Sequence, residues 1–171
     1  MAESGASEGS ATSRTSAEAV VTSEQLRQHW QGHRRLTRRM IEAFPEHELF
    51  SYSIGGMRTF AELVSEFLSM AVPTLIGVTS RKWPDTSSGE KPKTKRELLS
   101  AWDETTSEID RLWNDISMAR FQEVDKAFGQ WEMPVHSLLL YIIDNEVHHR
   151  GQGYVYLRAL GIEPPPFYSR D

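Results

Sequence analysis

The sequence contains no cysteine among its 171 residues. Disulfides, thiolate metal sites and a cysteine nucleophile are therefore excluded, and the composition fits a reducing compartment. Basic residues are not in excess, since the net charge is -5, so we expect no nucleic-acid partner. No apolar run comes near the roughly 20 residues that span a bilayer, and residues 1–19 lack the apolar middle of a signal peptide. We therefore expect a cytoplasmic protein with no membrane partner.

The first part of the chain differs in composition from the rest. Residues 1–19 are rich in Ala, Ser, Thr, Gly and Glu, which predicts a disordered tail over residues 1–21. Residues 22–171 contain the apolar and aromatic positions, and this length suits one globular domain. We therefore expect a tail followed by a single domain.

Four amphipathic helices are predicted in that domain. Three begin with a capping box, a Thr followed three residues later by Gln or Glu, at residues 22–25, 59–62 and 94–97. The first helix should end at Phe44, before a proline. The fourth runs over about residues 135–160, with Pro134 at its start and Gly161 closing it in a left-handed cap. With no convincing strand alternation, the pattern predicts an all-α four-helix bundle.

The segments between these helices are read as connections. Residues 46–57 form a connection with a glycine turn, residues 79–93 a long polar loop, and residues 117–133 an irregular stretch that packs one end of the domain. On the first helix, one face is strongly basic and is interpreted as a solvated surface: Arg34, Arg35, Arg38 and Arg39.

The fourth helix has a polar centre within an apolar stripe. Steps of three and four along it give an inward row whose ends are apolar or aromatic and whose middle is polar. Polar side chains can be buried at low cost only when they have hydrogen-bond or ionic partners, so a polar site is predicted in the core. Glu146 and His148 are predicted to point away from it. The row is Leu138, Tyr141, Ile142, Asn145, His149, Gln152 and Tyr156.

Four side chains on these helices are candidates for a functional site. Glu66 lies on the apolar stripe of the second helix, where its carboxylate either needs a cation, a metal or a proton, or reaches water at the stripe's edge. Asn145 and His149 are four residues apart, the spacing by which one helix presents two ligands to a metal ion. His149 could equally be a core histidine satisfied by hydrogen bonds. His33, on the stripe of the first helix, could line a pocket, act as a general base or fill the core.

The C-terminal residues resemble a known family. The run Asn145-Glu146-Val147-His148-His149-Arg150-Gly151-Gln152, followed by Tyr156-Leu157-Arg158, Gly161 and Pro164-Pro165, is similar to the H-E-x-H-H-R-G-Q signature of DinB/YfiT-like proteins. The resemblance implies a four-helix bundle, commonly dimeric, with one divalent metal held by three histidines. By position, these ligands fall on Glu66, Asn145 and His149. Only one of the three is histidine here, which shifts the site toward oxygen-preferring ions and weakens it.

Two functions follow from the resemblance. Relatives include thiol-dependent S-transferases and metal-dependent hydrolases, so the first expectation is an enzyme with a divalent ion (Zn, Ni, Fe or Mn) at Glu66, Asn145 and His149. Its partners would be a small-molecule thiol or electrophile and a second copy of the chain, with His33 as a catalytic base. The second expectation is a non-catalytic, dimeric, stress-associated module whose metal site has degenerated.

Overall fold

The structure, a computed structural model, describes residues 20–85 and 91–171, so most of the predicted tail lies outside the described residues. Five α-helices, a short 3-10 helix and two strands are assigned in these two ranges. In chain order they are α1 (Ser23–Ala43), α2 (Glu46–Ser51), α3 (Phe60–Ser80), α4 (Lys95–Trp113), η1 (Arg120–Gln122), β1 (Val124–Ala127), β2 (Trp131–Pro134) and α5 (Val135–Ala159).

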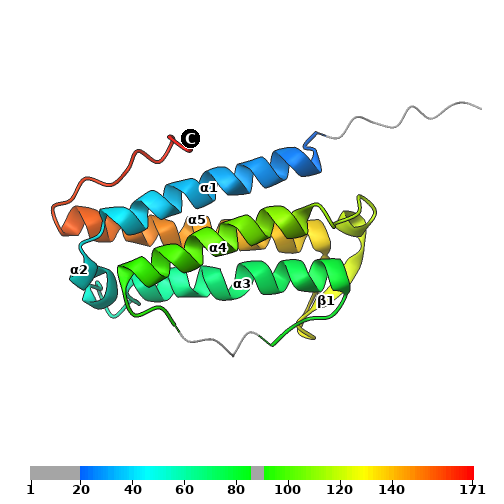
Figure 1. The fold of residues 1–171 in the computed structure, drawn as a ribbon, viewed down its shortest axis with the longest axis horizontal. Helices are drawn as coiled ribbons and strands as arrows, with labels where there is room; N and C mark the ends of the chain where they lie inside the picture. The colour runs from blue at the N-terminus through cyan, green and yellow to red at the C-terminus, as the bar shows by residue number, and fades with distance from the viewer. Residues whose placement is uncertain (1–19, 86–90) are drawn as a thin grey trace, which may run out of the picture.

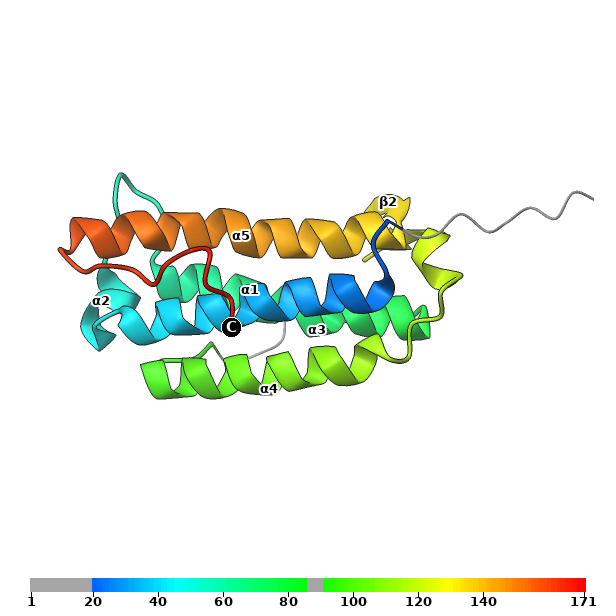
Figure 2. The ribbon, with the colours of Figure 1, turned by 90° about the horizontal axis from the view of Figure 1, so that it is seen from above.

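The four long helices form the predicted four-helix bundle (Figures 1 and 2). Helix α1 packs against α4 and α5, and α3 packs against the same two helices. Each long helix therefore buries side chains against two neighbours. For α5 this means that one row of residues faces α1 and another faces α3, a property that determines where its polar residues go.

The helix ends follow the predicted signals. Thr22, Thr59 and Thr94 are the N-caps of α1, α3 and α4, and each box has both of its reciprocal hydrogen bonds. At the other end of the chain, Gly161 has φ 76° and α5 ends at Ala159, as the left-handed cap requires. Local capping chemistry therefore defines most of the helix boundaries.

Two connections contain secondary structure that we did not predict. Residues 46–57 include the short helix α2, and residues 117–133 include an antiparallel hairpin in which Ala127 pairs with Trp131. Both strands are mostly exposed or half-buried, so they carry no apolar alternation by which a strand could be recognised. The hairpin was missed for this reason, although the predicted all-α class describes the bundle itself.

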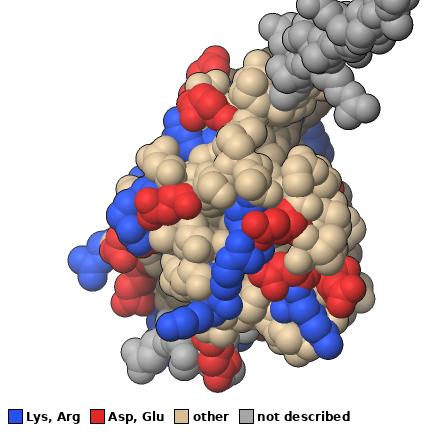
Figure 3. All heavy atoms as spheres, turned by 90° about the vertical axis from the view of Figure 1, so that its right-hand side faces the viewer, with Lys and Arg blue, Asp and Glu red and all other residues tan. Residues whose placement is uncertain are grey.

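The hairpin is attached to the end of α3 by a buried arginine. Arg120 donates from Nε to the carbonyl of Val78 at 2.8 Å, and its Nη atoms pair with Glu123 and Asp125. Acidic and basic side chains are interspersed on the surface of this end of the bundle (Figure 3). Arg120 therefore positions the hairpin relative to α3.

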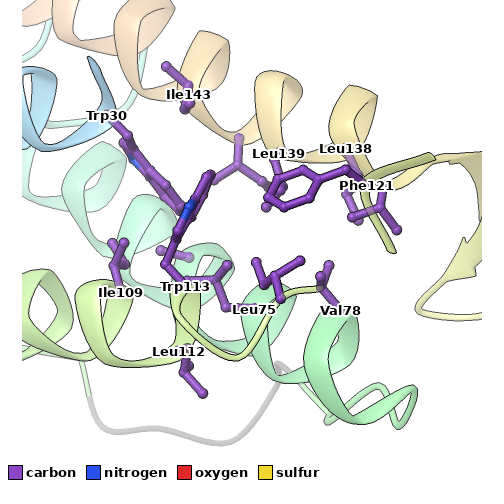
Figure 4. Packing of buried hydrophobic residues seen from close by; sticks show 14 of the residues in the cluster. Trp30, Leu75, Val78, Ile109, Leu112, Trp113, Phe121, Leu138, Leu139 and Ile143 are labelled. Atoms are coloured by element: carbon purple, nitrogen blue, oxygen red, sulfur yellow. The ribbon is translucent and has the colours of Figure 1, made fainter. Parts of the chain in front are cut away.

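The core has two apolar clusters, one toward each end of the bundle. In the cluster nearer the hairpin, the rings of Trp30 and Trp113 lie 6.1 Å apart, edge to face, among aliphatic side chains (Figure 4). The other contains Phe44 and Phe60, whose rings are stacked at 4.8 Å. Helix α3 contributes to both and, contrary to expectation, is long and apolar enough to span a membrane, although many of its residues are buried inside the bundle.

Candidate functional site

Glu66, Asn145 and His149, which the sequence predicts as one site, lie together between α3 and α5. The Asn145 amide Nδ2 donates to Glu66 Oε1 at 2.9 Å, and His149 Nε2 lies 3.5 Å from the same oxygen. The side chains of Glu66 and His149 are 25% and 17% exposed. The cluster therefore lies at the edge of the core, within reach of a ligand from solvent.

The tautomer of His149 is determined by a neighbour one turn away. Nδ1 of His149 lies 2.9 Å from Gln152 Oε1, an oxygen that can only accept, so Nδ1 carries the proton. In the neutral ring, Nε2 then presents a lone pair to the carboxylate of Glu66. Two acceptors at 3.5 Å repel each other unless a cation or a proton lies between them. This arrangement is the one that metal-binding histidines use.

Two further contacts bear on the carboxylate and the amide. The guanidinium of Arg58 forms an ion pair with Glu66 Oε2, and the Arg58 side chain is 47% exposed. Asn145 Oδ1 is buried and has no hydrogen-bond partner, while Nδ2 also contacts the Met70 sulfur at 3.4 Å. Burying a carbonyl oxygen without a hydrogen-bond partner costs about 1–3 kcal/mol of folding free energy, and a ligand that bound this oxygen would remove that cost.

The donor set fits a divalent ion, with Arg58 as its competitor. Ligand atoms that each lie about 2.0–2.2 Å from one ion are separated by roughly 2.8–3.6 Å, a range that includes the 3.5 Å between Glu66 Oε1 and His149 Nε2. A half-turn of the Asn145 amide exchanges Nδ2 for the unpartnered oxygen. In residues 20–85 and 91–171, no three His, Cys, Asp or Glu side chains converge to hold a metal, so an ion at this site would need the Asn145 amide as its third donor.

A second polar group, which the sequence interpretation missed, lies in the core between α1 and α5. Glu146, predicted to point away, is 2% exposed. It accepts a 2.6 Å hydrogen bond from the Thr37 hydroxyl and a 3.3 Å bond from Trp30 Nε1. Arg150 Nη1 lies 3.8 Å from the same carboxylate. The prediction for Glu146 was wrong because α5 buries two rows of side chains.

Arg34 is also buried, at 1% exposure, so its assignment to a solvated face was wrong. Its guanidinium stacks on the Trp102 ring at 3.3 Å and donates to the Trp102 carbonyl at 3.0 Å. Burial lowers the pKa of Arg34 to about 10, although the Glu146 carboxylate, 3.9 Å away, opposes the shift. The other three arginines of that predicted face are exposed or half-buried, so the prediction was wrong for Arg34 alone. They are Arg35, Arg38 and Arg39.

His33 belongs to this buried network and not to the Glu66 cluster. Arg150 Nη2 donates to His33 Nδ1 at 2.8 Å, so Nε2 carries the proton and donates to His29 Nε2 at 3.2 Å. Burial, reinforced by the charge of Arg150, lowers the pKa of His33 to about 3. Both ring nitrogens are engaged, and nothing in this geometry supports a role for His33 as a base.

A separate cavity of about 550 Å³ adjoins His33, between α1, α5 and the C-terminal segment. That segment doubles back along α5 and ends over α1 (Figure 2). Its backbone is held there by Arg35, which donates to the Arg170 carbonyl at 2.8 Å, and by Arg39, which donates to the Ser169 carbonyl. The structure thus separates His33 from the residues with which it was grouped.

The sequence does contain a signal for the missed pair. A second row along α5 advances by steps of four and three, and it too has apolar ends and a polar middle. Glu146 and Arg150 occupy that middle, four residues apart. The row is Leu139, Ile143, Glu146, Arg150, Gly153 and Leu157.

The fold and the two polar groups define a helical-bundle protein with a carboxylate, amide and imidazole cluster at the edge of its core. The DinB family model matches residues 16–171, and the chain belongs to the DinB family. It is 22% identical over 154 residues to the "Uncharacterized protein YjoA" of Bacillus subtilis (strain 168), which covers 88% of this chain and 99% of that protein.

Solved structures agree on the fold. The crystal structure of the DinB-like protein YjoA from Bacillus subtilis superposes with a TM-score of 0.72 at 19% identity, over 86% of this chain and 99% of that one. A DinB-like protein from Bacillus cereus ATCC 10987 gives a TM-score of 0.70 at 20% identity, over 85% and 97%. At this identity, the likeness establishes the architecture and leaves the chemistry to be argued from the site.

Proposed function

We propose that this DinB-family protein is a metal-dependent enzyme, of the transferase or hydrolase type, that acts on a small molecule. Glu66, Asn145 and His149 would hold one divalent ion, of the Zn, Ni, Fe or Mn kind. The observation that supports this most is the lone pair of His149 Nε2, aimed by Gln152 at a carboxylate oxygen 3.5 Å away. A bound ion would supply Lewis acidity, lowering the pKa of a bound water or thiol.

The residues of the chain have distinct tasks in this proposal. Gln152 holds the proton of His149 on Nδ1, so that Nε2 remains free to bind. Arg58 neutralises the carboxylate in the absence of an ion and, being half-exposed, can swing into solvent when one arrives. With three protein donors, the remaining positions around an ion stay open to water or substrate.

Arg58 also supports a second candidate function, a metal-free binding module. A guanidinium already balances the charge of Glu66, and the Asn145 amide donates to the other oxygen. In that case a proton on His149 Nε2 would complete the cluster as an ion pair. Such a protein would correspond to the non-catalytic, stress-associated alternative.

Calorimetric titration with Zn²⁺, Ni²⁺ and Mn²⁺, on protein purified without a metal-affinity step, distinguishes the two. The enzyme proposal expects one ion per chain, loss of binding in His149→Ala, and weakening of about 10–100-fold in Gln152→Leu. His148→Ala, a substitution of the neighbouring exposed histidine, is the matched control and should bind as the wild type does.

Arg58→Gln makes the comparison sharper. Removing the competing cation should tighten binding if the wild type has a metal site. Wild-type protein that binds none of the three ions, while Glu66→His combined with Asn145→His gains binding, would establish the metal-free module instead.

We also propose that the protein is a cytoplasmic homodimer. Helix α5 exposes three apolar side chains in one row, Leu140, Val147 and Val155, at 41%, 37% and 55%. Sedimentation equilibrium of the wild type and of Val147→Glu tests this, because a charge in a buried interface should shift the equilibrium to monomer. A wild type that is monomeric at every concentration of a 100-fold dilution series would refute the dimer.

A further inference from the structure

A small apolar cavity opens beside the Glu66 cluster, between α3, α5 and the hairpin. Its volume is about 170 Å³, and no charged side chain lines it. An apolar cavity of about 150 Å³ is large enough to hold a benzene molecule. The lining residues are Met70, Phe128, Trp131, Met133, Leu138, Tyr141 and Ile142.

The hairpin builds one wall of this cavity at an energetic cost. Phe128 has φ 52°, a left-handed conformation that is unusual for an aromatic residue and that costs roughly 1–2 kcal/mol. In this conformation its ring lies 4.9 Å from the ring of Trp83 and 6.3 Å from that of Trp131. Trp131 remains 52% exposed, so the cavity can be reached from solvent.

The cavity and the polar cluster adjoin each other at Met70. Met70 lines the cavity, and its sulfur lies 3.4 Å from Asn145 Nδ2. Along α3, Glu66 is one turn from Met70, and along α5, Tyr141 is one turn from Asn145. Four residues of an α-helix advance about 6 Å, so a linker of a few atoms can join a group in the cavity to a group at the cluster.

We infer that this cavity receives the apolar end of the substrate: an uncharged aromatic ring or compact alkyl group, linked through one to three atoms to the polar group that reacts at Glu66, Asn145 and His149. The inference deepens the proposed function and rests on it for the reacting end only. The apolar end is recognised by burial in the cavity, whether or not an ion is bound.

Methionine-methyl NMR tests this inference, because the chain has only six methionines and two of them line the cavity. The probes are toluene and benzyl alcohol, the second adding a hydroxyl to the same ring. Both should shift the methyl signals of Met70 and Met133, with a Kd on the order of 1 mM. The signals of Met40, in the other core cluster, and of exposed Met118 should stay in place.

A filled cavity should abolish the effect. Met133→Trp introduces a large ring from a half-buried position of the hairpin and should remove the toluene-induced shift of Met70. Met118→Trp, the same substitution at an exposed position, is the control and should leave the Met70 shift unchanged. Absence of shifts at Met70 and Met133 in the wild type would overturn the inference, as would shifts that persist in Met133→Trp.

The hydroxyl of benzyl alcohol tests the polar end of the proposed substrate site, at Glu66, Asn145 and His149. His149→Ala should weaken benzyl alcohol binding by about fivefold, the effect of one hydrogen bond, and leave toluene binding unchanged. Equal effects on both probes would overturn the assignment of the reacting end. Because toluene binding needs no ion, a failed metal titration with intact toluene shifts would refute the metal proposal and not the cavity.

Discussion

Replacing Glu146 by alanine should cost about 3–5 kcal/mol of folding free energy. The wild-type carboxylate accepts hydrogen bonds from Thr37 at 2.6 Å and Trp30 at 3.3 Å, and it lies 3.9 Å from Arg34 and 3.8 Å from Arg150. Its removal takes from two buried guanidiniums the carboxylate that forms ion pairs with both. Domains of this size have a total stability of about 5–15 kcal/mol, so the loss is a large fraction of it.

Urea unfolding, followed by far-UV circular dichroism, measures the effect. Asp144→Ala, an exposed acidic residue on the same helix, is the matched control and should change the free energy of unfolding by no more than about 0.5 kcal/mol. Glu146→Gln, which keeps an acceptor for Thr37 but removes the charge, should fall between the two. If Glu146→Ala costs no more than Asp144→Ala, the carboxylate does not balance the buried arginines and the reasoning fails.

Two other predictions concern single positions. Gly153→Ala should destabilise, because its new methyl would lie 2.4 Å from the buried Phe60 ring, whereas Gly151→Ala, which meets no atom within 4 Å, should stabilise by up to about 1 kcal/mol. Thermal unfolding of the pair should therefore give melting temperatures that move in opposite directions; a shared sign would contradict the packing. The pKa of His33 is lowered to about 3 on folding, so the unfolded chain binds an extra proton between that value and about pH 6.5, and stability is lost as the pH falls through this window. His33→Gln should reduce the slope of unfolding free energy against pH by up to about 1.4 kcal/mol per unit there, and His47→Gln, at an exposed position, should not.

The architecture could be predicted because its signals are local. Each capping box satisfies backbone N–H groups with residues at most three positions away, so Thr22, Thr59 and Thr94 define helix starts whatever the rest of the chain does. The left-handed cap at Gly161 works in the same way at a helix end. The hairpin was missed because its short strands are exposed or half-buried and show no apolar alternation, while the contact that attaches it to α3, from Arg120 to the Val78 carbonyl, joins residues remote in sequence.

The site was predicted only in part, for a reason that lies in the packing of α5. A single inward stripe leads to Asn145 and His149, and these residues do meet Glu66. But α5 faces both α1 and α3, so a second row is buried as well, and it places Glu146 and Arg150 in the core. Periodicity identifies which residues share a row; it does not say how many rows are covered.

The sequence by itself determined the four helices, the starts of those that carry capping boxes and the membership of the DinB family, and it placed Asn145 and His149 on one row of α5. Only the tertiary structure decided that Arg58 pairs with Glu66, that Arg34 lies in the core, and that His33 belongs to a different cavity. The last two depend on distances between residues remote in the chain, and the first on how the turn before α3 brings Arg58 back over that helix. Such distances follow from how helices pack, and local residue preferences do not encode them.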